Sequence, residues 1–429
     1  MGVFGAMLTA VSGLRSQSYA LENISGNIAN SQTTGFKRVD TAFSDLIPDM
    51  PRGREVAGSV AAYARATNST PGDRQNSSVG THLALNGEGF FTVAQRSGYT
   101  NGLPSFNGQQ FYTRRGDFEV DRDGYLVNGS GYYLVGRAFD PLTGAPSATT
   151  GPIQLPTTAI PAKRTATITY SGNLPRGATA MNGAIFPPAT TSISAANESA
   201  FLSQSIAGGT TTVYTAAGDA VSLEVRWGKF SDGTWGMFYR SNNPPDVWTK
   251  AGSNVSFNAD GSPAGAVGPF NLSPLVANGQ TIGNVTINFP TGKFTQYANA
   301  SGLAEVDLKA DGYTAGKLNG ITISSDGRVN GSYSNGQVLP LSQIQIAQFN
   351  ADNSLQRLNG GIFAETFESG APIYGLGSSS VASGALEASN VDIAEEFSKM
   401  IVTQQAYSAN TRVVTTAQQM LSDVINIVR

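Results

Sequence analysis

A chain of 429 residues is long enough for about three domains of roughly 150 residues each. Charged residues make up only 13% of it, and a net charge of −3 excludes an electrostatic case for binding nucleic acid or an anionic membrane. There is no cysteine, which excludes disulfides and fits a protein that leaves the cell unfolded. We expect no membrane insertion, because no run of about 18 apolar residues occurs, and the N-terminus lacks the basic region of a secretory signal.

The first predicted element is an amphipathic helix over residues 4–28. Its apolar residues recur at heptad spacing, which predicts packing against other helices. The candidate packing residues are Phe4, Met7, Val11, Leu14, Leu21, Ile24 and Ile28. Gly13 and Gly26 each cost about 1 kcal/mol relative to Ala in a helix. They predict local fraying on one interpretation, and close helix packing or a bend on the other.

The long middle of the chain is predicted to be mainly β. Residues 33–80 and 365–387 are interpreted as extended connectors, and strands are expected from Leu83 onward. Ten Asn-Gly and five Asp-Gly pairs predict many tight hairpin turns, because they supply the positive φ angles that such turns need. Asn86-Gly87, Asn128-Gly129, Asn319-Gly320 and Asn330-Gly331 are examples.

The middle is also predicted to hold two β domains, one inserted into the other. A Pro-rich stretch from Pro141 to Pro161 suggests a crossing between domains. Residues 151–305 form the expected inserted outer domain, with strands near 165–170, 221–227 and 285–289. Residues 81–150 and 306–364 share one hairpin style and form the expected first β domain. This nesting would keep residues 1–32 and 388–429, the terminal helical domain, together.

The last predicted element is a long helix over residues 390–428. Ser389 or Asn390 is the expected N-cap, with Asp392 as the acid of a capping box. The packing candidates lie at heptad spacing or beside it: Ile393, Phe397, Met400, Ile401, Tyr407, Val414, Leu421, Ile425 and Val428.

Two heptad helices around a β body indicate the fold class. We expect a mainly β multidomain body whose long terminal α-helices form a coiled-coil tube between subunits. The alternative is a coiled coil within one chain or a dimer. In the tube, the ends would bind neighbouring copies while the middle folds alone.

No catalytic, cofactor-binding or metal site is expected. The single histidine, His82, stands without a carboxylate cluster and is interpreted as structural or solvent-facing. Asp121 to Gly124 lacks the later ligands of a calcium loop and is interpreted as a hairpin turn. Aromatic pairs such as Phe90-Phe91 and the segment from Trp227 to Trp235 favour strand packing over a carbohydrate platform.

Four ordered motifs carry a resemblance to a known family. Residues 27–37, which include Asn27, Asn30, Thr33, Thr34, Gly35 and Phe36, resemble the N-terminal signature of the bacterial flagellar rod and hook proteins. Residues 85–93 and 112–118 resemble the motifs that follow it. Residues 384–392 and the helix after them are similar to the C-terminal motif, although Gln404 to Tyr407 depart from it. The inserted region shows no motif that matches.

The resemblance implies a structural role and no enzymatic activity. Large insertions are typical of the hook member of the family, so it implies a hook subunit that polymerises into a curved universal joint; a distal rod subunit is the alternative. It also implies type III export, and contacts with rod, hook-cap and hook–filament junction proteins. The alternative from another class is a secreted carbohydrate-binding or glycan-cleaving β protein.

Overall fold

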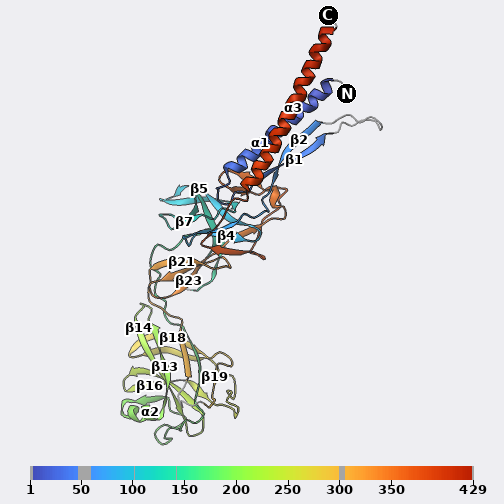
Figure 1. Cartoon of the computed structure of the whole chain (residues 1–429). Helices are drawn as coiled ribbons and strands as arrows, with labels where there is room; N and C mark the ends of the chain where they lie inside the picture. The colour runs from blue at the N-terminus through green and yellow to red at the C-terminus, as the bar shows by residue number, and fades with distance from the viewer. Residues whose placement is uncertain (1–2, 47–58, 101, 142, 299–304, 428–429) are drawn as a thin grey trace. The chain divides into compact units, whose positions relative to one another are not determined.

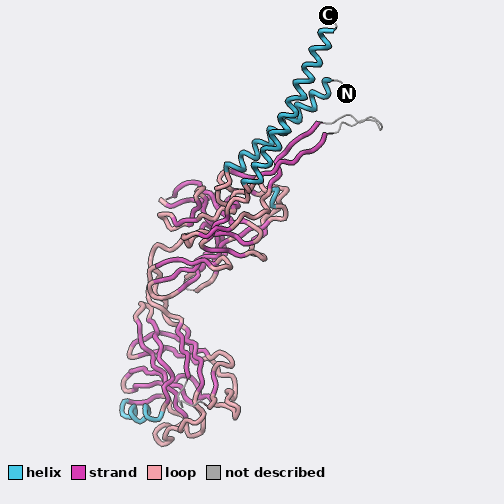
Figure 2. Tube along the Cα trace, in the orientation of Figure 1, coloured by secondary structure: helices cyan, strands magenta, loops and turns pink. Residues whose placement is uncertain are grey.

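A computed structural model of the chain describes residues 3–46, 59–100, 102–141, 143–298 and 305–427 (Figure 1). Strands are the commonest regular element of the described structure, and the long helices are the two at the ends of the chain (Figure 2). None of the helices in these ranges is long and apolar enough to cross a membrane. The predicted mainly β chain with long terminal helices is therefore confirmed.

The chain divides into two compact units. The first unit comprises residues 1–157, 320–332 and 338–429, and the second comprises residues 158–319 and 333–337. The first passage between them, at residues 157 and 158, falls inside the Pro-rich stretch.

Two terminal helices and a hairpin form one end of the first unit. Helix α1 (Val3–Ala29) packs on helix α3 (Ile393–Ile427). The pair is antiparallel, because Asn27 contacts Glu396 while Gly13 faces Asn410. Strands β1 (Val39–Leu46) and β2 (Ser59–Ala66) pair antiparallel and pack along α1. The segment predicted as an extended connector thus contains a hairpin.

The rest of the first unit is built on one sheet, with 13 strands among the described residues. The main order is β21 (Leu318–Ile323), β22 (Arg328–Tyr333), β23 (Val338–Ile344), β9 (Tyr132–Phe139), β5 (Phe90–Thr100), β6 (Leu103–Thr113), β26 (Ile362–Ala364) and β25 (Gln356–Leu358). The strands attached to this path are β7 (Phe118–Val120), β8 (Leu126–Asn128), β10 (Pro146–Pro152), β24 (Ile346–Gln348) and β27 (Ile373–Tyr374). A 3₁₀ turn, η2 (Asp352–Ser354), precedes β25.

Two short ladders join the C-terminal segment to the early part of the chain. Strand β28 (Ser380–Ser383) pairs with β4 (Leu83–Asn86), and β29 (Ala385–Glu387) pairs with β3 (Arg74–Asn76). Both pairs are antiparallel. They place the start of α3 next to the segment that follows α1.

The second unit contains two five-stranded sheets. The first has the order β17 (Phe270–Ala277), β18 (Gln280–Asn288), β11 (Thr167–Asn173) and β19 (Phe294–Thr295), with β20 (Glu305–Ala310) pairing with β11. The second has the order β12 (Ser192–Ser194), β16 (Asp246–Val255), β15 (Trp235–Asn243), β14 (Ala220–Lys229) and β13 (Ile206–Tyr214). The turn η1 (Ala195–Asn197) and helix α2 (Glu198–Gln204) follow β12.

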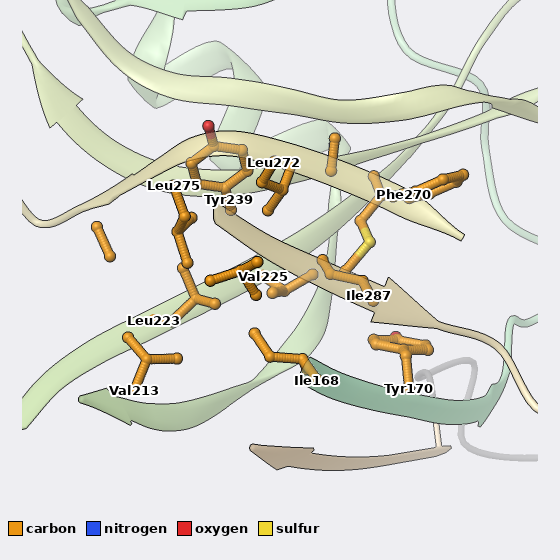
Figure 3. Close-up of a cluster of buried hydrophobic side chains, with 14 of the residues drawn as sticks. Ile168, Tyr170, Val213, Leu223, Val225, Tyr239, Phe270, Leu272, Leu275 and Ile287 are labelled. Atoms are coloured by element: carbon orange, nitrogen blue, oxygen red, sulfur yellow. The ribbon is translucent and has the colours of Figure 1, made fainter. Parts of the chain in front are cut away.

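One hydrophobic core joins the two sheets of the second unit (Figure 3). Val213, Leu223 and Val225 come from one sheet, and Ile168 and Ile287 from the other; all are fully buried or nearly so. Alternating strand residues point to the same face of a sheet, so each sheet contributes one apolar face to this core.

Most predicted strands are present, but some predicted turns are not. The strands expected near 165–170, 221–227 and 285–289 correspond to β11, β14 and β18. Gly87 and Gly124 have the positive φ angles of turns, at 108° and 86°. Gly320 and Gly331 instead lie inside β21 and β22, so the turns predicted at Asn319-Gly320 and Asn330-Gly331 are wrong. Gly331 pairs with Leu339, and strand pairing thus decided the local conformation.

Candidate assembly surface on the terminal helices

The contact between α1 and α3 is made of small and polar side chains. Glu396, Thr403, Asn410 and Ala417 stand seven residues apart on α3, and therefore lie on one side of it. Two of them contact α1, and all except the half-buried Asn410 are at least nine-tenths buried. A Cβ atom on Gly13 would lie 3.0 Å from the Asn410 Nδ2 atom. Gly13 therefore allows close packing.

Gly26 has no such neighbour. A Cβ atom built on it meets nothing within 4 Å. Close packing therefore explains one of the two helix glycines and not the other.

The predicted packing residues are distributed around this seam. On α1, Ile24 is buried and Phe4 is exposed. The half-buried ones are Met7, Val11, Leu14, Leu21, Ile28, Met400, Val414 and Leu421. The exposed ones on α3 are Ile393, Phe397, Ile401, Tyr407 and Ile425. Val428 lies outside the described residues. A single chain thus leaves much of the predicted apolar surface uncovered.

A buried polar contact fixes the base of the helix pair. The Asn27 amide donates to Glu396 Oε2 and to the Val39 carbonyl, each at 2.9 Å, and its own oxygen accepts from the Val39 N–H at 2.9 Å. Lys399 Nζ lies 2.9 Å from Glu396 Oε1 and 3.4 Å from Asp40. The asparagine thereby joins α1, β1 and α3. Glu396 and Lys399 were not predicted, because polar partners more than 350 residues apart leave no periodic signal.

The start of α3 differs from the prediction. Asp392 Oδ1 accepts from the N–H groups of Ala394 and Glu395 at 2.8 and 3.1 Å, so Asp392 is the N-cap. Asn390, one of the two predicted caps, instead accepts from the Arg38 N–H at 2.7 Å. The prediction of Ser389 or Asn390 as the cap is therefore wrong. Long-range contacts hold these residues outside the helix.

The motif residues after α1 shape the turn that leaves the helix. The Asn30 amide donates to the Gly26 carbonyl, and the Thr33 hydroxyl lies 3.2 Å from Asn30 Oδ1. Gly35 has a φ of 66°, and a Cβ atom on it would lie 2.7 Å from the Arg115 backbone nitrogen. Only glycine fits that position without strain.

The motif residues on either side of Gly35 are half-buried. Phe36 lies under the Arg357 guanidinium, whose central carbon is 5.2 Å from the ring centroid. Thr34 is half-buried.

A buried ion cluster then connects three distant segments. Lys37 Nζ lies 2.5 Å from Glu387 Oε1, and Arg114 Nη1 lies 3.2 Å from Glu387 Oε2. All three side chains are nearly fully buried. Burial lowers the pKa of Lys37, and the Glu387 carboxylate opposes that shift. Glu387 also accepts from the Gly72 N–H at 3.0 Å, so it binds the segment before β3 as well.

The residues that could have formed a catalytic, metal or carbohydrate site instead contribute to the fold. His82 is half-buried, with its Nδ1 atom 2.8 Å from the Ser77 hydroxyl. Trp227 and Trp235 are fully buried, so they offer no platform to a carbohydrate. Asp121 accepts from the backbone of Asp123 and Tyr125 in a turn, as predicted. Within the described ranges, no three His, Asp or Glu residues are grouped to hold a metal ion.

Comparison with known proteins places the chain. Residues 7–37 match the family described as flagella basal body rod protein. Residues 84–174 match the flagellar hook protein FlgE/F/G D1 domain, and residues 382–427 match the flagellar basal body rod FlgEFG protein C-terminal family. The flagellar hook protein FlgE of Rhizobium meliloti is 32% identical over the full length of both chains. The chain belongs to the flagellar hook protein FlgE family.

A second relative agrees with this assignment. FlgE of Salmonella typhimurium is 31% identical over 97% of this chain and 98% of its own. The crystal structure of Helicobacter pylori flagellar hook protein FlgE2 covers 72% of this chain and 98% of its own, with 14% identity and a TM-score of 0.48. The protein is a structural hook component of the bacterial flagellum, and family membership implies a homopolymer.

Proposed function

We propose that this FlgE-family chain polymerises through its terminal helices into a coiled-coil tube, which forms a curved universal joint between rod and filament. The exposed apolar surface of α3 carries the proposal: Phe397, Ile401 and Ile425 are 50%, 56% and 62% exposed. Side chains of this size gain free energy when a neighbour covers them, about 25 cal/mol for each Å² buried. A contact between different patches on two copies gives an open helical polymer when its rotation does not close into a ring.

The β units would form the outer layers of this tube. We infer a nested architecture, with residues 151–305 as the inserted outer domain, 81–150 and 306–364 as the first β domain, and 33–80 and 365–387 as connectors. Strand β20 pairs with β11, which supports extending the inserted domain past residue 305 to about residue 319. The low content of charged residues favours weak polar contacts between outer domains, which would slide as the joint bends. A bending stiffness that depends strongly on salt would contradict this.

Partners and export follow from the same proposal. The chain would be exported through the flagellar type III apparatus, and would contact rod, hook-cap and hook–filament junction proteins. Terminal segments that order on assembly suit a chain that is exported unfolded.

Deleting the gene and imaging purified basal bodies by electron microscopy tests the proposal. A complete rod without a hook, restored by the wild-type gene, is the expected result. A rod that stops short would instead identify a distal rod subunit. Normal hooks would contradict both assignments.

A further inference from the structure

Helix α3 carries a second apolar stripe, which is largely exposed. Val402, Val413, Met420 and Val424 are 65%, 45%, 51% and 56% exposed. With Ala406 and Ala409 they follow a spacing of three, four or seven residues, the spacing of one helix face. This stripe lies beside the seam of Glu396, Thr403, Asn410 and Ala417, on α3 itself. It is an apolar face that the described residues of the single chain leave largely exposed.

Helix α1 and its hairpin offer a matching concave surface. A groove of about 700 Å³ runs between α1 and β2. Its main lining residues are Leu8, Val11, Arg15, Tyr19, Leu46 and Val60. Leu8 and Leu46 at its rim are 67% and 51% exposed. An apolar groove of this kind suits the apolar face of a helix.

The charges beside the two surfaces are complementary. Arg15 and Glu22 are the charged residues of α1, and Arg412 and Asp423 are those of α3 beyond Lys399. All four are exposed, and none forms an ion pair within the described residues. In an antiparallel arrangement, Arg15 can meet Asp423 while Glu22 meets Arg412. Arg15 and Glu22 are seven residues apart, and Arg412 and Asp423 are eleven residues apart. These two spacings differ by about 6 Å along a helix, which arginine side chains can span.

We propose that the α3 stripe of one copy seats in the α1–β2 groove of a second copy, with Asp423 opposite Arg15 and Arg412 opposite Glu22. This rests on the proposed self-assembly and specifies its contact. Within one chain Asn410 faces Gly13, so Asp423 lies well beyond Arg15. In the proposed contact, the α3 of the second copy is therefore shifted along α1 relative to the α3 of the same chain. The shift is eleven to fifteen residues, or about 16 to 22 Å along the helix. Helical symmetry keeps neighbouring α3 helices in the same direction, so the contact stays antiparallel.

Charge reversal tests the pairing. Arg15→Glu alone and Asp423→Lys alone should each raise the protein concentration needed for polymerisation by about tenfold, because like charges then meet in the contact. The combined variant should recover most of that loss. If the combined variant polymerises no better than either single one, the pairing is overturned.

Cysteine cross-linking tests the register, because the chain has no cysteine of its own. Tyr19→Cys combined with Met420→Cys should give a ladder of disulfide-linked multimers from assembled hooks, removed by reductant. Within one chain these positions are about 16 residues out of register, roughly 24 Å, which is far beyond disulfide reach. The control pairs Tyr19→Cys with Thr411→Cys. Thr411 is nine residues from Met420, on the opposite side of α3.

The outcomes separate the contact from the proposed function. A ladder from the first pair and none from the control supports the contact. Hooks without a ladder, or with equal ladders from both pairs, overturn it while leaving self-assembly intact. If the wild-type chain forms no hook or polymer, the proposed function itself fails. Should the double variant not assemble, the charge-reversal series decides.

Discussion

The Lys37–Glu387–Arg114 cluster shows how single residues connect the two ends of this chain. A buried carboxylate between two cations is stabilising only while both charges stay paired. Glu387→Gln keeps the shape but leaves Lys37 and Arg114 without a counter-charge. We expect the first unit to lose about 3–5 kcal/mol of unfolding free energy.

Chemical denaturation of the purified chain measures this loss. The control is Asp326→Asn, which breaks the half-exposed ion pair with Arg328 and should change stability by less than about 1 kcal/mol. Equal effects from the two variants would contradict a special role for the cluster.

Asp352, near the same cluster, gives a pH-dependent prediction. Burial raises the pKa of this carboxyl group, although Arg114 and Lys37 lower it. The folded state therefore holds the proton more tightly than the unfolded state, and the favourable contribution is lost as pH rises through the raised pKa. Asp352→Asn removes the ionisation. Its stability relative to the parent should be higher at pH 7 than at pH 3, as measured by thermal unfolding. A difference that does not change with pH would refute this.

At the scale of elements, the two helix glycines should respond in opposite directions. Gly13→Val places branched carbons against Asn410 and should separate α1 from α3. Gly26→Ala meets nothing within 4 Å and should stabilise α1 by up to about 1 kcal/mol. Amide exchange of α1 and α3 in assembled protein measures both effects. Slower exchange in Gly13→Val would show that close packing is unimportant there.

The terminal helices and many strands could be predicted because their apolar residues recur with the period of one helix face or one strand face. Two features could not be predicted in this way. The seam on α3 contains Glu396, Thr403 and Asn410, and a search for apolar heptads selects its neighbours instead. Asn330-Gly331 has the sequence of a turn, but pairing with β23 holds it in a strand. Residues distant in the sequence determine both the seam and this strand, and a short stretch of sequence does not contain those residues.

At the scale of the whole molecule, the β units and the terminal helices bury their apolar residues differently. The second unit has a closed core with fully buried Trp227, Trp235 and Phe294. Among the α3 residues whose side chains are described, 393–425, Ala417 is the one buried apolar residue. The β units therefore have closed cores in one chain, whereas the described part of α3 leaves most of its apolar side chains exposed or half-buried.

This difference predicts that assembly and folding can be separated by one substitution. Leu421 is half-buried on α3, near the end of the described helix. Leu421→Asp places a charge on an apolar helix face that a neighbour must cover, and an unpaired buried charge opposes association strongly. The variant should keep the unfolding transitions of both β units and fail to form tubes in electron micrographs. Leu21→Asp on α1 should behave in the same way.

The exposed Thr415→Asp serves as the control for added charge, because its neighbours on the helix face, Thr411, Arg412, Gln418 and Gln419, are all polar. Normal tubes from Leu421→Asp would show that α3 does not drive assembly, and loss of the β-unit transitions would show that the helices and the body fold as one.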